Sequence, residues 1–174
     1  FSLDFPEGWT IQNAPTQVVA KRPDADVYLL LQLVEKPIGR DIEDIALASM
    51  KQAGLQRVDG SRTTINGLDA FVGTYQGSMQ DLGRVGVRAA HVAYDKNVYL
   101  IAGLAPEKIF IQAEPQLTSS VRSFRPLTVA QAAKIRPNRI DLYTARQGDT
   151  WQSIAERAGK GVIKATTLAI MNGH

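Results

Sequence analysis

Apolar residues in the first part of the chain recur at every second position. This alternation predicts strands at 1–5 and 9–11, separated by a turn at 6–8. The segments 17–21 and 27–35 predict a hairpin, and the continuous apolar middle of the second one indicates a strand buried on both faces. A strand of that kind is expected at the centre of a sheet.

Two later segments have the period of a helix. Residues 41–53 place apolar side chains three and four positions apart, with Asp41 as a cap at the start and Gly54 after the end. The segment 107–123 has the same period but contains Pro115, which predicts that this second helix is split or kinked.

Between the two helical segments, alternation returns four times. It predicts strands at 55–65, 70–76, 85–94 and 97–103. The turns Asn66-Gly67 and Asp95-Lys96-Asn97 fit antiparallel hairpins. The order of strands, helix, strands and helix predicts an α+β fold, in which helices pack on an antiparallel sheet.

Composition adds limits to this picture. A chain of 174 residues with 44% hydrophobic and 21% charged residues is typical of one or two globular domains. It contains no run of eighteen apolar residues, so no transmembrane segment is predicted. Because the first residue is Phe1, the chain looks like a mature or excised fragment. The absence of cysteine excludes disulfides and thiolate ligands, and leaves the redox compartment open.

Charge is distributed unevenly along the chain. Residues 1–124 contain 12 Lys and Arg against 14 Asp and Glu, whereas residues 125–174 contain 8 against 3. A basic segment can face an acidic polymer, lipid headgroups or nucleic acid, but a solvated linker is the favoured interpretation. Aromatic residues are sparse there and no nucleic-acid motif accompanies the charge, so no nucleic-acid partner is predicted.

The change in composition predicts three parts. Residues 1–124 form the α+β domain, residues 125–139 form a hinge with a short helix at 129–135 capped by Thr128, and residues 140–174 form a small βαα module.

Within the small module, 140–144 is the expected strand. Asp149 or Thr150 is a suitable N-cap, and Asp149 and Gln152 have capping-box spacing. The apolar face of the helix that follows consists of Trp151, Ile154, Ala155 and Ala158. A second helix at 164–171 ends at Asn172-Gly173.

The run from Tyr143 to Trp151, with Ser153-Ile154-Ala155 after it, resembles the first two thirds of a LysM module. The resemblance implies a strand-helix-helix-strand fold that binds polymers of N-acetylglucosamine such as peptidoglycan. The second strand of that fold has no counterpart before His174. The carbohydrate-binding residues implied by the resemblance are Gly148, Asp149, Thr150, Trp151 and Asn172. Trp151 stands where the family usually has an aliphatic residue, and filling the small core is favoured over stacking on a sugar.

Two further resemblances concern the remainder of the chain. Phe5-Pro6-Glu7-Gly8-Trp9, followed by the predicted sheet and helices, is similar to Mog1/PsbP-like domains. The hinge, from Phe124-Arg125-Pro126-Leu127-Thr128 to Arg139-Ile140, resembles the C-terminal extension of some bacterial M48 (Ste24/BepA-like) zinc metalloproteases. Together they imply the non-catalytic rear of a periplasmic or cell-envelope protease. The catalytic domain, with its zinc ion, would then lie upstream of this chain and would be a partner of it.

The chain's own residues give no candidate catalytic or metal site, and no cofactor is predicted. An M48-type site needs two His at i and i+4 with a Glu between them, but the histidines are His91, on a predicted strand, and His174. His91 is interpreted as a structural or surface residue. Asp41, Glu43 and Asp44 are interpreted as a first helical turn favoured by the helix dipole. Two alternatives stay open: an envelope scaffold without a protease, and an enzyme that uses a cleft around His91.

Overall fold

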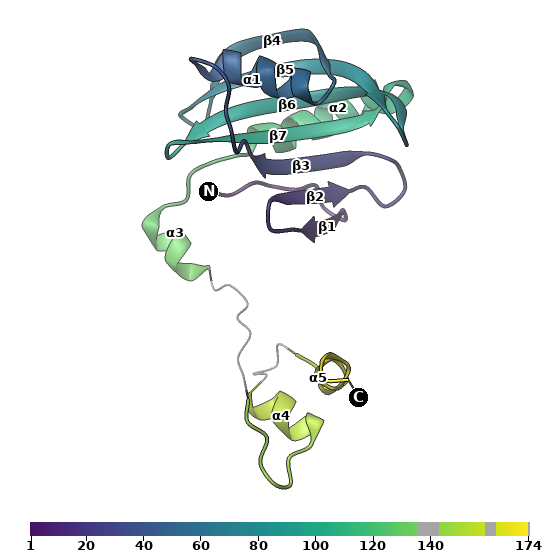
Figure 1. Cartoon of the computed structure of the whole chain (residues 1–174), viewed down its shortest axis with the longest axis vertical. Helices are drawn as coiled ribbons and strands as arrows, with labels where there is room; N and C mark the ends of the chain where they lie inside the picture. The colour runs from purple at the N-terminus through teal and green to yellow at the C-terminus, as the bar shows by residue number, and fades with distance from the viewer. Residues whose placement is uncertain (136–142, 159–162, 174) are drawn as a thin grey trace. The chain divides into compact units, whose positions relative to one another are not determined.

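The computed structural model describes residues 1–135, 143–158 and 163–173. The chain forms two compact units, Phe1–Ala132 and Ala133–His174, and each is considered by itself (Figure 1). The predicted division at residues 124 and 139 stays a prediction. Among the described residues, no helix is both long and apolar enough to cross a bilayer.

The front unit is built on a seven-stranded antiparallel sheet in the order β1-β2-β3-β7-β6-β5-β4 (Figure 1). The strands are β1 (Thr10–Asn13), β2 (Gln17–Lys21), β3 (Tyr28–Leu33), β4 (Gln56–Ile65), β5 (Leu68–Met79), β6 (Gly83–Tyr94) and β7 (Asn97–Pro106). The α+β fold, which was predicted from the order of strand and helix patterns along the sequence, is confirmed. The hairpin of β4 and β5 turns at Asn66-Gly67, as predicted, with both residues in the left-handed region.

Two helices cover opposite faces of this sheet. Helix α1 (Ile42–Gln52) packs on β4, β5 and β6, and helix α2 (Glu107–Arg122) packs on β6 and β7. Val85 and Val87 cluster with Met50 of α1, whereas Gly86 between them faces Phe110 of α2. Successive residues of a strand point to opposite faces, so the two helices lie on different sides.

Glycines let α2 lie close to the sheet. A Cβ atom added at Gly103 would lie 2.7 Å from Leu117 Cβ, and one added at Gly86 would collide with the Phe110 ring. Both positions are strand interiors, where glycine is otherwise unfavourable. The close approach of helix and sheet therefore explains these glycines.

Three local predictions are wrong. Residues 1–5 make one bridge, Ser2 to Arg125, instead of a strand, while Leu3 and Phe5 pack against the core. Helix α2 continues through Pro115, so the predicted split is wrong, while the alternative of a kink stays a prediction. The carbonyl that Pro115 leaves without a helical donor belongs to Ile111, which is 84% exposed, so water can replace the missing hydrogen bond.

The third correction concerns β3. Leu29 and Leu31 are buried, but Leu30 between them is only half-buried, so one face is fully covered and the other is not. The strand lies inside the sheet between β2 and β7, and the central place in the strand order belongs to β7. Among the described residues, helix α1 packs mainly on β4, β5 and β6, which agrees with the incomplete burial of β3 on that face.

The C-terminal unit contains helix α4 (Trp151–Arg157) and helix α5 (Ala165–Met171), which pack on each other. Ile154 and Ala155 are its buried apolar residues among those described. Helix α3 (Val129–Lys134) spans the boundary between the two units and begins after Thr128, which forms a reciprocal pair with Gln131 and so confirms the predicted cap.

Candidate functional site

The loop before α4 is held by hydrogen bonds that differ in part from the predicted ones. Thr150 is the N-cap: its hydroxyl accepts from the Ser153 backbone N–H at 3.2 Å, and Ser153 Oγ accepts from the Thr150 N–H at 3.0 Å. The capping box therefore pairs Thr150 with Ser153, one residue later than the predicted pair of Asp149 and Gln152. Ser153 was missed because its side chain is shorter than the Glu or Gln usual at that position.

Asp149 has a different structural role. Its side chain is 4% exposed and accepts from the Arg146 backbone N–H at 2.8 Å, from the Tyr143 hydroxyl at 3.0 Å and from the Arg157 guanidinium. These donors hold the pKa of Asp149 below its ordinary value, and the Arg146 backbone N–H has the largest effect. Both carboxylate oxygens are engaged within the protein, so Asp149 shapes the loop.

The other predicted sugar-binding residues lie at the two ends of the helices. Gly148 is exposed in the turn with φ of +88°, and Trp151 is half-buried in the first turn of α4. Asn172 ends α5, where its side-chain amide donates to the Leu168 carbonyl at 2.8 Å. The structure thus joins four of the five residues at the loop before α4 and uses Asn172 as a helix cap.

The strand predicted at 140–144 falls mostly outside the described residues. Its last two residues, Tyr143 and Thr144, are described and are not in a strand. The exposure of Trp151 is compatible with both roles considered for it, filling the core and stacking on a sugar.

His91 is fully buried in β6, between Phe71 of β5 and Leu100 of β7, on the face that α1 covers. In the part of the chain that the structure describes, neither ring nitrogen has a hydrogen-bond partner. Burial lowers the pKa of His91 to about 4, so the ring is neutral at neutral pH. A side chain with no exposed surface cannot meet a substrate in this structure, which argues against a cleft around His91.

The acidic residues at the start of α1 have the structural role predicted for them. Asp41 Oδ1 accepts from the backbone N–H groups of Glu43 and Asp44, each at 3.0 Å, and Glu43 pairs with Arg57 at 3.1 Å. Over residues 1–135, 143–158 and 163–173, no group of three or more His, Asp or Glu side chains is arranged to hold a metal. The described residues therefore do not fit a zinc ion.

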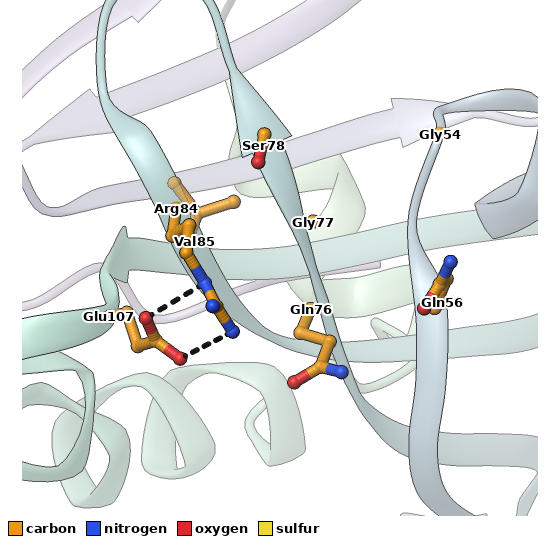
Figure 2. A pocket seen from close by; sticks show the side chains of 8 residues that line it. All are labelled: Gly54, Gln56, Gln76, Gly77, Ser78, Arg84, Val85 and Glu107. Atoms are coloured by element: carbon orange, nitrogen blue, oxygen red, sulfur yellow. Dashed lines mark hydrogen bonds and ion pairs between the residues drawn. The ribbon is translucent and has the colours of Figure 1, made fainter.

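A polar pocket that the sequence did not predict lies at one end of the sheet. It measures about 450 Å³ and is lined by residues of β4, β5, β6 and the first turn of α2 (Figure 2). Arg84 and Glu107 form one wall, with two contacts of 3.0 Å between guanidinium and carboxylate. Figure 2 shows the Gln76 side chain between this pair and Gln56.

A β-bulge in β4 places Gln56 opposite Gln76 of β5. From Ile65 back to Asp59, the β4–β5 pairs follow the two-residue turn, but the register shifts by one between Asp59 and Arg57. Gln56 therefore lies opposite Gln76, where an unbroken register would have placed Arg57. Because the sequence carries no clear signal for this bulge, pairing outward from the turn would not have found the site.

Solved structures show which fold the front unit has. PA94 from Pseudomonas aeruginosa, a protein of unknown function, has a TM-score of 0.54 and 15% identity, covering 73% of this chain and 92% of its own. Cyanobacterial PsbP (CyanoP) from Synechocystis sp. PCC 6803 has a TM-score of 0.52 and 11% identity, covering 70% of this chain and 83% of its own. The front unit has a PsbP-like fold. At these identities, the likeness shows the fold alone.

This fold confirms the resemblance to Mog1/PsbP-like domains that the sequence of the front unit indicated. LpqN of Mycobacterium tuberculosis, described as involved in cell envelope biogenesis, has a TM-score of 0.46 and 14% identity, covering 70% of this chain and 79% of its own. That score is too low to support an argument. No protein-family model matches the chain, and no curated protein matches it.

Proposed function

We propose that this chain is a non-catalytic binding region of a bacterial cell-envelope protein. In this proposal the C-terminal unit binds peptidoglycan or a related polymer of N-acetylglucosamine. The PsbP-like front unit serves as an interaction domain for a neighbouring catalytic domain or another protein. The proposal rests on the LysM-like run from Tyr143 to Trp151 and on the loop that this run forms.

The observation that carries the proposal is the division of roles within that loop. Asp149 and Thr150 are engaged in hydrogen bonds that fix the backbone before α4. Beside them, Gly148 is exposed and has no side chain to keep a ligand from the backbone, and Trp151 is half-buried. An indole can stack on the apolar face of a sugar ring while backbone groups bind its hydroxyls.

The parent protein proposed for this region is an M48-type zinc metalloprotease of the periplasm or cell envelope. In this proposal zinc belongs to an upstream catalytic domain, as the resemblance of the hinge to M48 proteases implies. Reading the upstream coding sequence for His-Glu-x-x-His tests this point. A complete upstream sequence without that motif would instead favour an envelope scaffold with no protease attached.

Co-sedimentation with insoluble peptidoglycan tests the glycan role. The whole 174-residue chain should sediment with the polymer, and Trp151→Ala should lower the bound fraction several-fold. Thr166→Ala, at an exposed position of α5, is the matched control and should bind like the unmodified chain. Circular dichroism of each variant checks that the helices persist. An unmodified chain that stays in the supernatant would end the proposal.

A further inference from the structure

The polar pocket of the front unit is lined by one positive and one negative group that neutralise each other. Arg84 Nε and Nη2 each lie 3.0 Å from a carboxylate oxygen of Glu107. A two-point pair of this kind fixes the planes of both groups. Among the residues that the structure describes, no other charged side chain lines the pocket. A phosphate, carboxylate or ammonium ligand would therefore find no unpaired opposite charge, and the lining favours a neutral ligand.

The remaining side chains of the pocket both donate and accept hydrogen bonds. Gln56 and Gln76 each carry a carbonyl oxygen and an NH₂ group, and Ser78 carries a hydroxyl. All three side chains are exposed, so they are free to turn toward a ligand. A side-chain amide pairs well with an acetamido group, because each partner offers one N–H and one C=O.

Apolar side chains are nearly absent from the lining. Within the described part of the chain, Val85 is the single residue of the lining with an apolar side chain larger than glycine's hydrogen, and it is 1% exposed. Large apolar groups of a ligand would find no apolar surface here, whereas the hydroxyl groups of a sugar would meet polar partners. The lining therefore favours a polar ligand over an apolar one.

The backbone around the pocket is built for close approach. A Cβ atom added at Gly77 would lie 2.7 Å from Leu55 Cδ2 and 3.1 Å from the Gly54 carbonyl oxygen. Glycine at this position lets the segment after α1 lie against β5 and form the pocket wall. The volume of about 450 Å³ falls in the range of small-molecule sites, about 300 to 1,000 Å³.

We propose that this pocket is a second glycan site, which takes a neutral saccharide bearing an acetamido group. Gln56 and Gln76 bind the acetamido group, and Ser78 binds a hydroxyl. The choice of N-acetylglucosamine as the sugar rests on the function proposed for the C-terminal unit. The inference that the pocket binds a neutral polar ligand does not depend on that function. With few hydrogen bonds and little apolar burial, the affinity is on the order of 1 mM. Two weak sites on one chain reinforce each other on a polymer.

The test uses the whole chain, labelled with nitrogen-15, and the soluble tetramer of N-acetylglucosamine as probe. Two-dimensional NMR follows the backbone amides of residues 54–107 and the side-chain amides of Gln56 and Gln76. We expect these signals to shift during titration. Gln76→Glu keeps the shape but removes the NH₂ donor, and should weaken the shifts in the front unit about tenfold. Gln112→Glu, at an exposed position of α2 away from the pocket, is the matched control and should change nothing.

Each outcome separates the two sites. Shifts at the side-chain amide of Gln56 and at the backbone amides of residues 54–107 that Gln76→Glu weakens support the pocket, whether or not the C-terminal unit responds. Shifts confined to residues 143–173 would support the C-terminal site and overturn the pocket. A spectrum without shifts in either unit would overturn both. Equal shifts in the unmodified chain and in Gln76→Glu would also overturn the pocket, because the proposed donor would then contribute nothing.

Discussion

Replacing His91 with leucine should remove a large part of the pH dependence of folding stability. His91 is buried without a polar partner in the described structure, and its pKa is lowered from 6.5 to about 4. In the unfolded chain the ring takes up a proton as the pH falls below about 6.5, whereas in the folded protein it stays neutral down to about 4. The unfolded state therefore binds more protons in this window, and stability falls as the pH falls.

The magnitude follows from the two pKa values. Between pH 7 and pH 5 the linkage relation gives a loss of about 2 kcal/mol from this one residue, and at pH 4 the loss reaches about 3 kcal/mol. In His91→Leu this pH-dependent contribution to the free energy of unfolding is absent. The substitution also removes an unpaired polar group from the core. The variant should therefore lose about 2 kcal/mol less than the unmodified protein between pH 7 and pH 5.

Urea unfolding of both proteins at pH 7 and pH 5, followed by circular dichroism, measures this difference. Comparing the change with pH, not the absolute stability, cancels the effect of the substitution on packing. His174 is present in both proteins and contributes equally. Equal losses of stability in the two proteins would refute the reasoning, because a histidine with an ordinary pKa in the folded state produces no such term.

Three further substitutions test the packing and the caps. Gly86→Ala should destabilise the front unit by about 1 to 3 kcal/mol, because the new methyl group meets the Phe110 ring; urea unfolding measures the loss. Thr150→Ala removes half of the capping box with Ser153 and should destabilise α4 by about 1 kcal/mol, seen as faster amide hydrogen exchange in that helix. Asn66→Gly keeps the left-handed turn but deletes two hydrogen bonds to carbonyls at the end of α2, and should lower the urea midpoint by an amount equivalent to about 1 to 2 kcal/mol.

Each of these substitutions has a control. Ser78→Ala at an exposed position of the neighbouring strand β5, Thr167→Ala at an exposed position of α5 and Gly67→Asn in the same turn as Asn66 change sites without the contact in question. The packing argument fails if Gly86→Ala is as stable as Ser78→Ala. The cap argument fails if α4 exchanges equally in Thr150→Ala and Thr167→Ala.

Regular patterns made most of the front unit predictable. All seven strands of the front sheet overlap strands predicted from the hydrophobic pattern, and both covering helices were predicted from their period. An eighth predicted strand, at residues 1–5, is wrong: its alternating apolar residues pack on the core, while only Ser2 among these residues makes a β-bridge. Alternation reports which side chains are buried, but not whether a neighbouring strand exists to pair with.

The candidate sites were less predictable, for physical reasons that differ. The loop at Gly148 to Trp151 was found from its motif, although the motif could not say that Asp149 is used internally. The pocket at Gln56 and Gln76 depends on a bulge and on residues that meet only in the folded sheet. His91 was interpreted as a structural or surface residue, but neither its complete burial nor its lack of a hydrogen-bond partner among the described residues could be predicted from the sequence.

Peptidoglycan co-sedimentation at two salt concentrations tests the central claim most directly. The chain's segment 125–174 is basic, so attraction to an acidic polymer is the competing explanation of any binding. Recognition through sugar hydroxyl and acetamido groups should persist when the salt is raised from about 0.15 M to about 0.5 M, and the soluble tetramer should compete with it. Binding that disappears at the higher salt and ignores the tetramer would contradict the account.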